Sequence, residues 1–255
     1  MLNVRIDKGI YTKIEWLSSS ERESIRLFSL MYQCVSLINP KWGVKNIAII
    51  IDEPELHLHP TNAELFISWI EKAVSLFSSS NHITSAQILL ATHSPLIAKK
   101  CLDYDNHAIR HIEDNGTSVT IKQKGLKPLR RVVSYAEIMY RYFDVVSSDF
   151  HDELYGALMK KVANSYSPPK DTSAIKTKCV DNYLRTMHNQ GVLIIKDFPV
   201  KWENDRLGIQ PYSYKIPVYL RNYIHHPENT KNAQIPHSDF EVYLRESIEI
   251  MDAIV

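Results

Sequence analysis

Apolar residues follow different patterns in the two halves of this sequence. In the first half they form two uninterrupted runs, at residues 47–51 and 88–91. Runs of this length without polar alternation are typical of strands covered on both faces in a parallel sheet. After a basic stretch at residues 124–131, apolar residues recur every three or four positions, as in helices. We therefore predict an α/β domain with a parallel sheet and helices over residues 1–125, and a mainly helical domain over residues 126–255.

Short local patterns predict where several of these elements begin and end. Three serine–glutamate pairs have the spacing of a capping box and predict helix N-termini: Ser20 with Glu23, Ser134 with Glu137, and Ser238 with Glu241. Gly191 is placed to end a helix over residues 172–189, and a short strand is expected at 192–195. Two alternating runs around Asn115 and Gly116 predict a β-hairpin with a type I′ turn.

Helical spacing also predicts which side chains are buried. Ser148 is expected to introduce a helix with a buried stripe at four-residue spacing: Phe150, Leu154, Leu158 and Val162. The helix that begins at Pro60 is expected to place six apolar residues mostly in the core: Leu65, Ile67, Trp69, Ile70, Val74 and Phe77.

The first apolar run ends in two adjacent acids, Asp52 and Glu53. Ligand crevices of open α/β sheets lie at the carboxyl ends of the strands. Carboxylates there suit Mg²⁺, which prefers oxygen ligands and shares them with substrate phosphates. Glu53 would then orient or deprotonate an attacking water. An acidic pair after a strand is also typical of an ordinary solvated loop, and the longer motif decides between these interpretations.

The string IIIDEPELHLHP, which ends at Pro60, resembles the Walker B segment of ABC-type ATPases. The resemblance is to the branch that includes structural-maintenance-of-chromosomes (SMC) proteins and the overcoming-lysogenisation-defect family. It implies that Asp52 holds Mg²⁺, that Glu53 is the catalytic glutamate, and that residues 55–60 form a turn facing a second subunit. Downstream, ILLATHSPLIA is a second apolar run ending in Thr92 and His93, and the resemblance implies that His93 touches the γ-phosphate of ATP.

Upstream, LSSSERESIRLF resembles the LSGGE-like signature of the same family. The resemblance implies that Ser18, Ser19, Ser20 and Glu21 bind the nucleotide of the other subunit in a dimer. Backbone N–H groups at a helix N-terminus and the helix dipole favour a phosphate there. The simpler alternative is that the serines only cap a helix. Ser20 departs from the glycine that the family usually has, and its Cβ limits how closely a nucleotide approaches.

A nucleotide-anchoring loop is missing from the sequence. An ATPase of this kind needs a loop of the form GxxxxGK(S/T) that wraps the phosphates in backbone amides. The sequence has seven glycines and no such loop. By resemblance it corresponds to the C-terminal lobe of an ABC-type ATPase, and we expect it to bind ATP poorly alone. Either another chain that contains a Walker A loop supplies the other lobe, or the sequence is truncated. The expected partner is therefore a second copy of this chain or a Walker A-containing partner chain.

A second candidate site lies in the helical half. Arg221 and His226 are separated by four residues, as in the motif of HEPN ribonucleases, in which the arginine and histidine act on the scissile phosphate and the 2′-hydroxyl. The alternative is a helix end that serves only for interaction, which Pro227 favours because it would end the helix. The segment also resembles PtuA-like ATPases of bacterial anti-phage defence. That resemblance implies a helical appendage binding a nuclease partner, DNA or RNA.

Composition narrows these possibilities. A net charge of +1 argues against a protein whose whole surface binds a polyanion.

The cysteines indicate the compartment. Three dispersed cysteines, Cys34, Cys101 and Cys179, are expected to be reduced and buried in a cytoplasmic protein, and they have no metal-binding spacing. We expect neither a secretory signal nor a membrane-spanning helix. His57 and His59 have a spacing that can bind metal on a strand, but are more typical of a turn at a subunit face.

Overall fold

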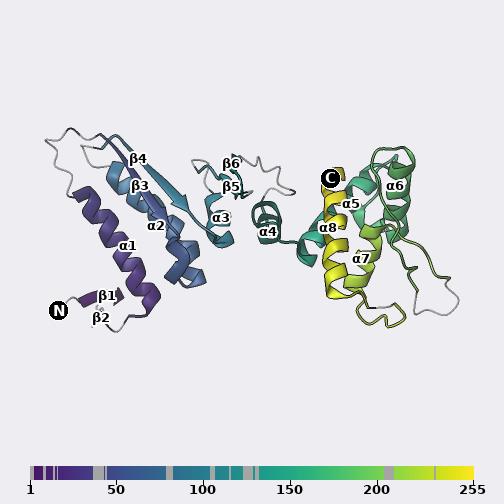
Figure 1. Ribbon diagram of the computed structural model, residues 1–255, viewed down its shortest axis with the longest axis horizontal. Coiled ribbons are helices and arrows are strands. Elements are labelled where there is room, and N and C mark those ends of the chain that lie inside the picture. Colours follow the sequence, from purple (N-terminus) through teal and green to yellow (C-terminus); the bar gives the residue numbers. More distant parts are fainter. Residues whose placement is uncertain are drawn as a thin grey trace. The chain divides into compact units, whose positions relative to one another are not determined.

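The chain divides into two compact units, Met1–Lys124 and Gly125–Val255, and each is described by itself (Figure 1). The computed structural model describes residues 3–7, 10–13, 15, 17–36, 43, 45–78, 83–103, 107–114, 116–122, 129, 132–203, 210–232 and 234–255. No helix among these residues is long and apolar enough to cross a membrane.

The first unit is built around a parallel strand pair. Strand β3 (Asn46–Asp52) lies beside β4 (Ser85–Ala91) in parallel, with Asn46 opposite Ser85 and Asp52 opposite Ala91. The helix α2 (Pro60–Ser78) connects the two strands, and α3 (Pro95–Cys101) follows β4. The remaining elements are the antiparallel pairs β1 (Asn3–Asp7) with β2 (Ile10–Lys13) and β5 (His111–Asp114) with β6 (Val119–Lys122), the helix α1 (Ser19–Ser36), and the 3₁₀ turn η3 (Pro54–His57).

One face of the β3–β4 pair is covered by helices. Its core consists of residues from α1, β3, α2 and α3, namely Met31, Ile51, Ala63, Phe66, Ile67, Ile70 and Ile97. On the other face Ile50 is 76% exposed and Leu89 50% exposed within the described part of the chain. The prediction that β3 is covered on both faces is therefore wrong for these residues. The parallel pairing and the α/β class are confirmed.

Local predictions for α1 and α2 agree with the structure in part. Helix α1 begins at Ser19, and Ser18 and Glu21 form a capping box there. The predicted pairing of Ser20 with Glu23 rests on a side chain outside the described residues. Glu23 pairs with Arg26, because one helical turn separates their side chains. In α2, Ile67 and Ile70 are buried and Trp69 and Val74 pack against the core, as predicted. Leu65 is exposed, and Phe66 is buried beside it. The Phe77 side chain lies outside the described residues.

The predicted β5–β6 hairpin is present, but its turn differs from the prediction. Asp114 pairs with Val119, which leaves four residues between the strands instead of the two of a type I′ turn. Gly116 has a φ of 75° and donates its amide to Asp114 Oδ1 at 2.8 Å, so the carboxylate stabilises the longer loop.

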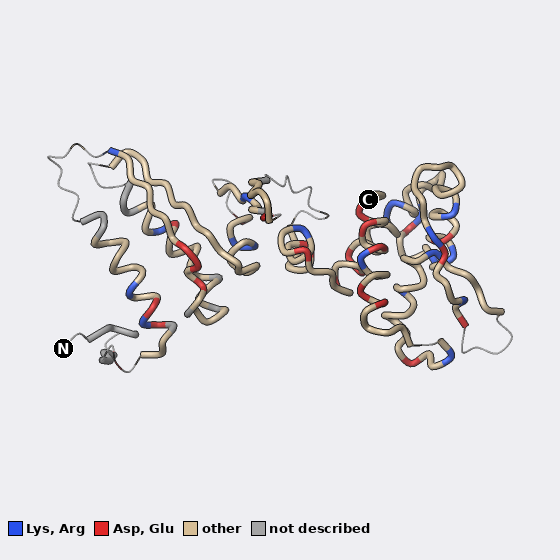
Figure 2. Tube along the Cα trace, in the orientation of Figure 1, with Lys and Arg blue, Asp and Glu red and all other residues tan. Residues whose placement is uncertain are grey.

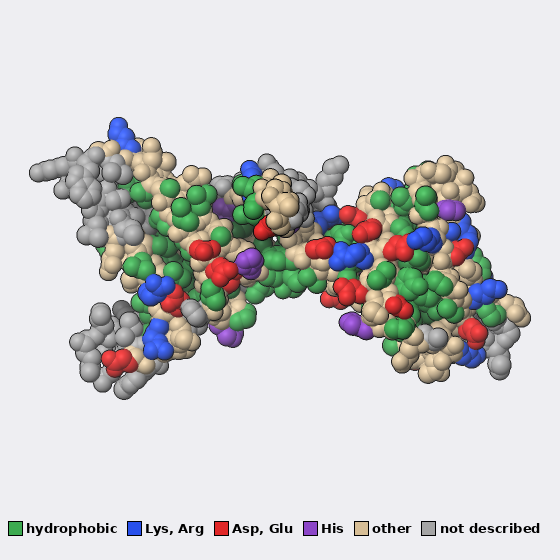
Figure 3. All heavy atoms as spheres, in the orientation of Figure 1, with side chains coloured by type: hydrophobic (Ala, Val, Ile, Leu, Met, Phe, Trp, Pro, Cys, Tyr) green, Lys and Arg blue, Asp and Glu red, His purple; other side chains and the backbone are tan. Residues whose placement is uncertain are grey.

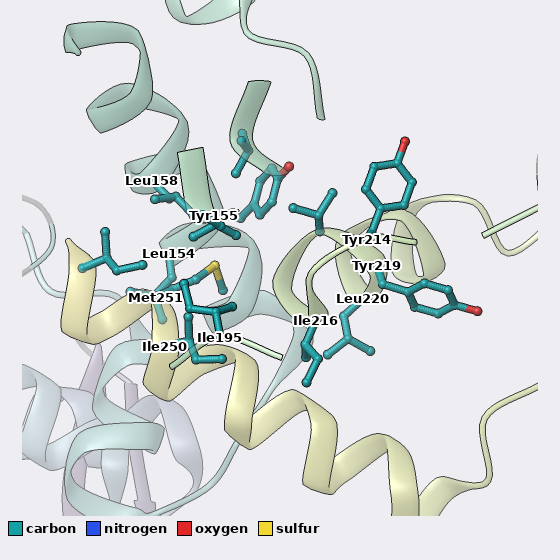
Figure 4. Close-up of a cluster of buried hydrophobic side chains, with 14 of the residues drawn as sticks. Leu154, Tyr155, Leu158, Ile195, Tyr214, Ile216, Tyr219, Leu220, Ile250 and Met251 are labelled. Carbon is teal, nitrogen blue, oxygen red and sulfur yellow. The ribbon is translucent and has the colours of Figure 1, made fainter. Parts of the chain in front are cut away.

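The second unit is a helical bundle, as predicted. It contains α4 (Tyr135–Phe143), α5 (Ser148–Asn164), the 3₁₀ turn η4 (Thr172–Ala174), α6 (Thr177–Asn189), α7 (Ile216–His225) and α8 (His237–Ile254). Leu154 of α5 lies beside Met251 of α8 (Figure 4), and Leu158 of α5 and Tyr219 of α7 belong to the same apolar core. All four predicted stripe residues of α5 are buried.

Helix ends in the second unit agree with the sequence to within a few residues. Ser134 accepts the amide of Glu137, as predicted, whereas the cap of α5 is Ser147 and α8 begins at His237, ahead of Ser238. Helix α6 begins at Thr177 because residues 172–174 form the separate turn η4. Residues 192–195 do not form the predicted strand.

A buried acid joins the segments around α6. Asp181 is fully buried and accepts hydrogen bonds from Arg185 Nε at 2.8 Å, Tyr212 Oη at 3.0 Å and the Lys215 amide at 2.8 Å. The Lys215 ammonium is also buried and donates to the carbonyl of Ile195 at 2.7 Å. Burial of a carboxylate is costly unless its oxygens are hydrogen-bonded, and these three donors meet that requirement.

Candidate functional site

Asp52 is the last residue of β3 and Glu53 follows it, so that acidic residues are consecutive at this strand end (Figure 2). The parallel register places the end of β4 directly beside them, and the Glu53 amide donates to the Ala91 carbonyl at 3.0 Å. Glu53 has φ 42° and ψ 55°, a left-handed conformation that is uncommon outside glycine. This conformation turns the chain sharply from the strand into η3. Backbone outliers of this kind cluster at functional sites.

The side chains of Glu53 and His93 approach each other across the two loops. His93 Nε2 lies 3.4 Å from Glu53 Oε1, and the side chains are 87% and 40% exposed. Histidine and acidic side chains lie next to one another on the surface of this unit (Figure 3). Both groups are accessible to a ligand, and a carboxylate beside an imidazole offers a hydrogen-bond acceptor and a donor at one point.

Glu55 connects the two strand-end loops through its carboxylate. Its Oε1 accepts the hydroxyl of Thr92 at 2.6 Å and the backbone amide of His93 at 2.7 Å. The other oxygen, Oε2, is buried and has no hydrogen-bond partner among the described residues. The Thr92 hydroxyl in turn accepts the Ser94 amide at 3.0 Å. Sequence reasoning placed Glu55 in a turn facing a second subunit and missed these contacts within its own unit.

The signature-like residues border an open groove. Its volume is about 740 Å³, and Ser18, Ser19 and Glu21 at the start of α1 line one side. The other side is lined by residues of η3 and of the segment after it, namely Leu56, Leu58, His59, Pro60 and Asn62. Hydrogen bonds from the hydroxyl and amide of Ser18 lower the pKa of Glu21, which therefore remains a carboxylate at neutral pH. The Ser20 side chain lies outside the described part of the structure.

The carboxylates at the end of β3 fit a hard divalent cation that also binds water and substrate phosphates. Asp52 is exposed at the carboxyl end of β3, next to Glu53. The described residues contain no group of three or more His, Cys, Asp or Glu side chains placed to hold a metal. One or two carboxylates supplemented by water and substrate phosphates are the usual protein ligands of Mg²⁺. The side chain of His57 lies outside the described part, so its pairing with His59 is not tested.

In the second unit, the described contacts do not bring Arg221 and His226 together. The Arg221 guanidinium lies over the ring of Tyr155, 5.9 Å from its centroid. His226 caps the C-terminal end of α7, and its Nδ1 lies 3.0 Å from Glu228 Oε1. The neighbouring His225 instead pairs with Asp152 of α5 at 3.0 Å.

Comparison with known proteins bears on the first unit. Residues 24–98 match a family model described as an AAA ATPase domain. This segment is similar to an AAA ATPase domain. The matched range contains Asp52, Glu53, Glu55 and His93 and begins after Glu21. The match supports an ATPase function for this part of the chain.

A solved structure from work on ATP-driven dimerisation and DNA-stimulated activation of SMC ATPases is similar at 15% identity with a TM-score of 0.33, over 47% of this chain and 61% of that chain. The chain thus spans 61% of the length of that SMC ATPase structure. A comparison with curated proteins finds no match.

Proposed function

We propose that the first unit is the Walker B and H-loop part of an ABC-type ATPase, and that it hydrolyses Mg²⁺-bound ATP once a Walker A lobe completes the site. The observation that carries the proposal is the approach of Glu53 and His93, at 3.4 Å, from the ends of adjacent parallel strands. Asp52 would hold Mg²⁺, which neutralises charge on the phosphates. Glu53 would orient and deprotonate the attacking water, and His93 would donate to the γ-phosphate.

The Walker A lobe must come from residues other than these 255, because the printed sequence has no GxxxxGK(S/T) loop. It would belong to a partner chain or to a further part of the same protein. Without its backbone amides, the three side chains offer a phosphate few donors. We therefore expect the chain alone to show no low-micromolar affinity for ATP with Mg²⁺ in calorimetry.

A dimer would complete the site from the other side. The groove lies between the start of α1 and residues 56–62, and a helix N-terminus favours a phosphate. In the proposed arrangement, Ser18, Ser19 and Ser20 would meet the nucleotide held by a second subunit. Glu21 would position this segment rather than contact phosphate, since its carboxylate already accepts two hydrogen bonds from Ser18.

Glu53→Gln tests the proposal in a complex reconstituted with the Walker A lobe. The substitution keeps the shape of the side chain and removes the base, so nucleotide binding should persist while turnover falls by roughly 10²- to 10⁴-fold. Asp103→Asn is the matched control, because this exposed acid pairs only with Lys100 at 2.8 Å among its described contacts. Turnover unchanged in Glu53→Gln would refute the proposal.

For the second unit we propose an interaction module that binds a nuclease partner or nucleic acid, in a DNA-related or anti-phage role. The support is that Arg221 and His226 have separate described partners, Tyr155 and Glu228. A HEPN-like ribonuclease is the alternative. If the purified chain cleaves RNA, and the cleavage disappears in both Arg221→Ala and His226→Ala, the ribonuclease replaces the interaction module as the proposed function.

A further inference from the structure

Two acids on the loop after β3 hold His93 at two different points. The Glu53 carboxylate lies 3.4 Å from the imidazole, and the Glu55 carboxylate accepts the His93 backbone amide at 2.7 Å. Between them, η3 turns the chain so that residues two positions apart reach the same residue of the other loop. The His93 side chain is otherwise 87% exposed, so packing does little to fix its orientation.

We propose that Glu55 is a positioning residue that orients His93 for phosphate contact, an inference that rests on the proposed ATPase function. Glu55 binds the backbone amide of His93, the residue that carries the imidazole, and does not itself touch the reacting atoms. The Thr92 hydroxyl, at 2.6 Å from the same oxygen, fixes the carboxylate from a second direction. One oxygen thus receives two donors from consecutive residues, and both bonds are of the short, charge-assisted kind.

This arrangement matters because a catalytic imidazole loses efficiency when it is displaced by about 1 Å. Loss of an outer group that orients a ligating or catalytic side chain typically costs roughly 10- to 100-fold in activity. The cost should appear in kcat rather than KM, since the ground-state nucleotide is held mainly by the Walker A lobe. Glu55→Ala in the reconstituted complex should therefore lower kcat by roughly 10- to 100-fold with KM nearly unchanged.

Two conservative variants distinguish positioning from a charge effect. Glu55→Gln keeps the reach of the side chain and an acceptor oxygen but removes the charge, whereas Glu55→Asp keeps the charge and shortens the reach by one methylene. Positioning predicts that Gln retains more activity than Asp. A direct electrostatic role predicts the reverse order, and that result would overturn the proposal.

The full chain without nucleotide gives a second test that does not depend on hydrolysis. In an NMR spectrum of the ¹⁵N-labelled chain, the His93 amide proton should resonate far downfield, because it donates to a carboxylate at 2.7 Å. Glu55→Ala should move this resonance and those of the His93 ring, Glu55→Gln should move them less, and Asp103→Ala should leave them in place. If Glu55→Ala leaves the His93 resonances unchanged, Glu55 does not position this residue.

The two tests also separate this proposal from the proposed function. If the complex fails to hydrolyse ATP while the His93 resonances respond as described, the ATPase proposal fails and the structural role of Glu55 stands. If Glu53→Gln stops turnover while Glu55→Ala changes neither kcat nor the His93 resonances, the ATPase proposal stands and this one fails. Where Glu55→Ala does not fold, Thr92→Val removes one of the two donors and should shift the same resonances.

Discussion

Ser18 and Glu21 hydrogen-bond to each other in both directions at the start of α1. The amide and hydroxyl of Ser18 donate to Glu21 Oε2 at 2.8 and 2.7 Å, and the Glu21 amide donates to Ser18 Oγ at 3.2 Å. This is a complete capping box, which satisfies two backbone donors that the helix leaves unpaired. The residues that resemble a signature motif therefore also determine where the helix begins.

Ser18→Ala should destabilise the first unit in a pH-dependent way. The hydrogen bonds from Ser18 lower the folded-state pKa of Glu21 below its ordinary value of 4.5. A depressed folded pKa contributes stability that is present above the unfolded pKa and is lost as pH falls through the folded pKa. Urea unfolding should show a lower midpoint for Ser18→Ala at pH 7 and a smaller difference from wild type below about pH 4. An equal difference at both pH values would contradict this account.

Two glycines of the second unit should respond oppositely to alanine. Gly191 has a φ of 70° after α6, where its amide bonds to the His188 carbonyl and the Val192 amide bonds to the Met187 carbonyl, a Schellman motif. Gly191→Ala should lower the free energy of unfolding by about 1 to 2 kcal/mol, because a Cβ disfavours this conformation. Gly156 lies inside α5 with no atom near its missing Cβ. Gly156→Ala should raise the stability by about 0.5 to 1 kcal/mol. Denaturant titration of both variants measures the difference, and equal effects would contradict it.

The sequence predicted what depends on local patterns and missed what depends on distant partners. The end of β3 at Asp52 and the end of β4 at Ala91, two residues before His93, followed from uninterrupted apolar runs, and the end of α6 followed from Gly191. By contrast, Glu55 bonds to residues 37 and 38 positions away, and Asp181 bonds to Tyr212 and Lys215, 31 and 34 positions away. A glutamate in a turn or an aspartate in a helix carries no local sign of such partners.

Ambiguity of short motifs explains another difference. The segment SSSERE fits a capping box at Ser18 with Glu21 and at Ser20 with Glu23, and the sequence alone does not indicate that the helix begins at Ser19 with Ser18 as its cap. The wrong prediction for the second face of β3 has another cause. An uninterrupted apolar run is typical of a strand covered on both faces, but the run itself does not indicate which residues would cover each face.

Asp181→Ala should destabilise the second unit strongly. The substitution removes a buried carboxylate and leaves Nε of Arg185 and the amide of Lys215 without the acceptor that each has in Asp181. Removal of one partner of a buried ion pair typically costs about 3 to 5 kcal/mol. Asp197 is the matched control, since it approaches the same Arg185 at 3.1 Å but is 44% exposed. Asp197→Ala should cost less than about 1 kcal/mol. Thermal unfolding of the two variants tests this contrast, which fails if their midpoints are equal.

Cys101 should react slowly with alkylating reagents. Sequence reasoning expected buried thiols, and the structure shows Cys101 and Cys179 as free and half-buried, while the Cys34 side chain lies outside the described part. Burial, and secondarily the charge of Glu71, raise the pKa of Cys101 to about 11. At pH 8 its thiolate fraction is then more than about 10-fold below that of an ordinary thiol with a pKa of about 8.5.

Mass spectrometry after iodoacetamide treatment can follow Cys101 alone. Its rate should continue to rise between pH 8 and 10, where an ordinary thiol approaches its plateau. Glu71→Gln should speed the reaction modestly by removing the smaller of the two causes. A rate at pH 8 equal to that of the urea-unfolded chain would show that the thiol is not shielded.

Asp52 and Glu53 should be distinguishable by the magnesium dependence of turnover in the completed ATPase. Asp52→Asn replaces an anionic oxygen with a neutral one, which weakens the attraction for Mg²⁺ while keeping a similar shape. Turnover should then require a higher Mg²⁺ concentration and should recover substantially at saturation. Glu53→Gln removes the base that acts on water, so added Mg²⁺ should not restore it. Initial rates over a magnesium titration measure both effects. If excess Mg²⁺ rescues Glu53→Gln and not Asp52→Asn, the two roles are reversed, and Glu53 with its left-handed backbone is the residue that holds the metal.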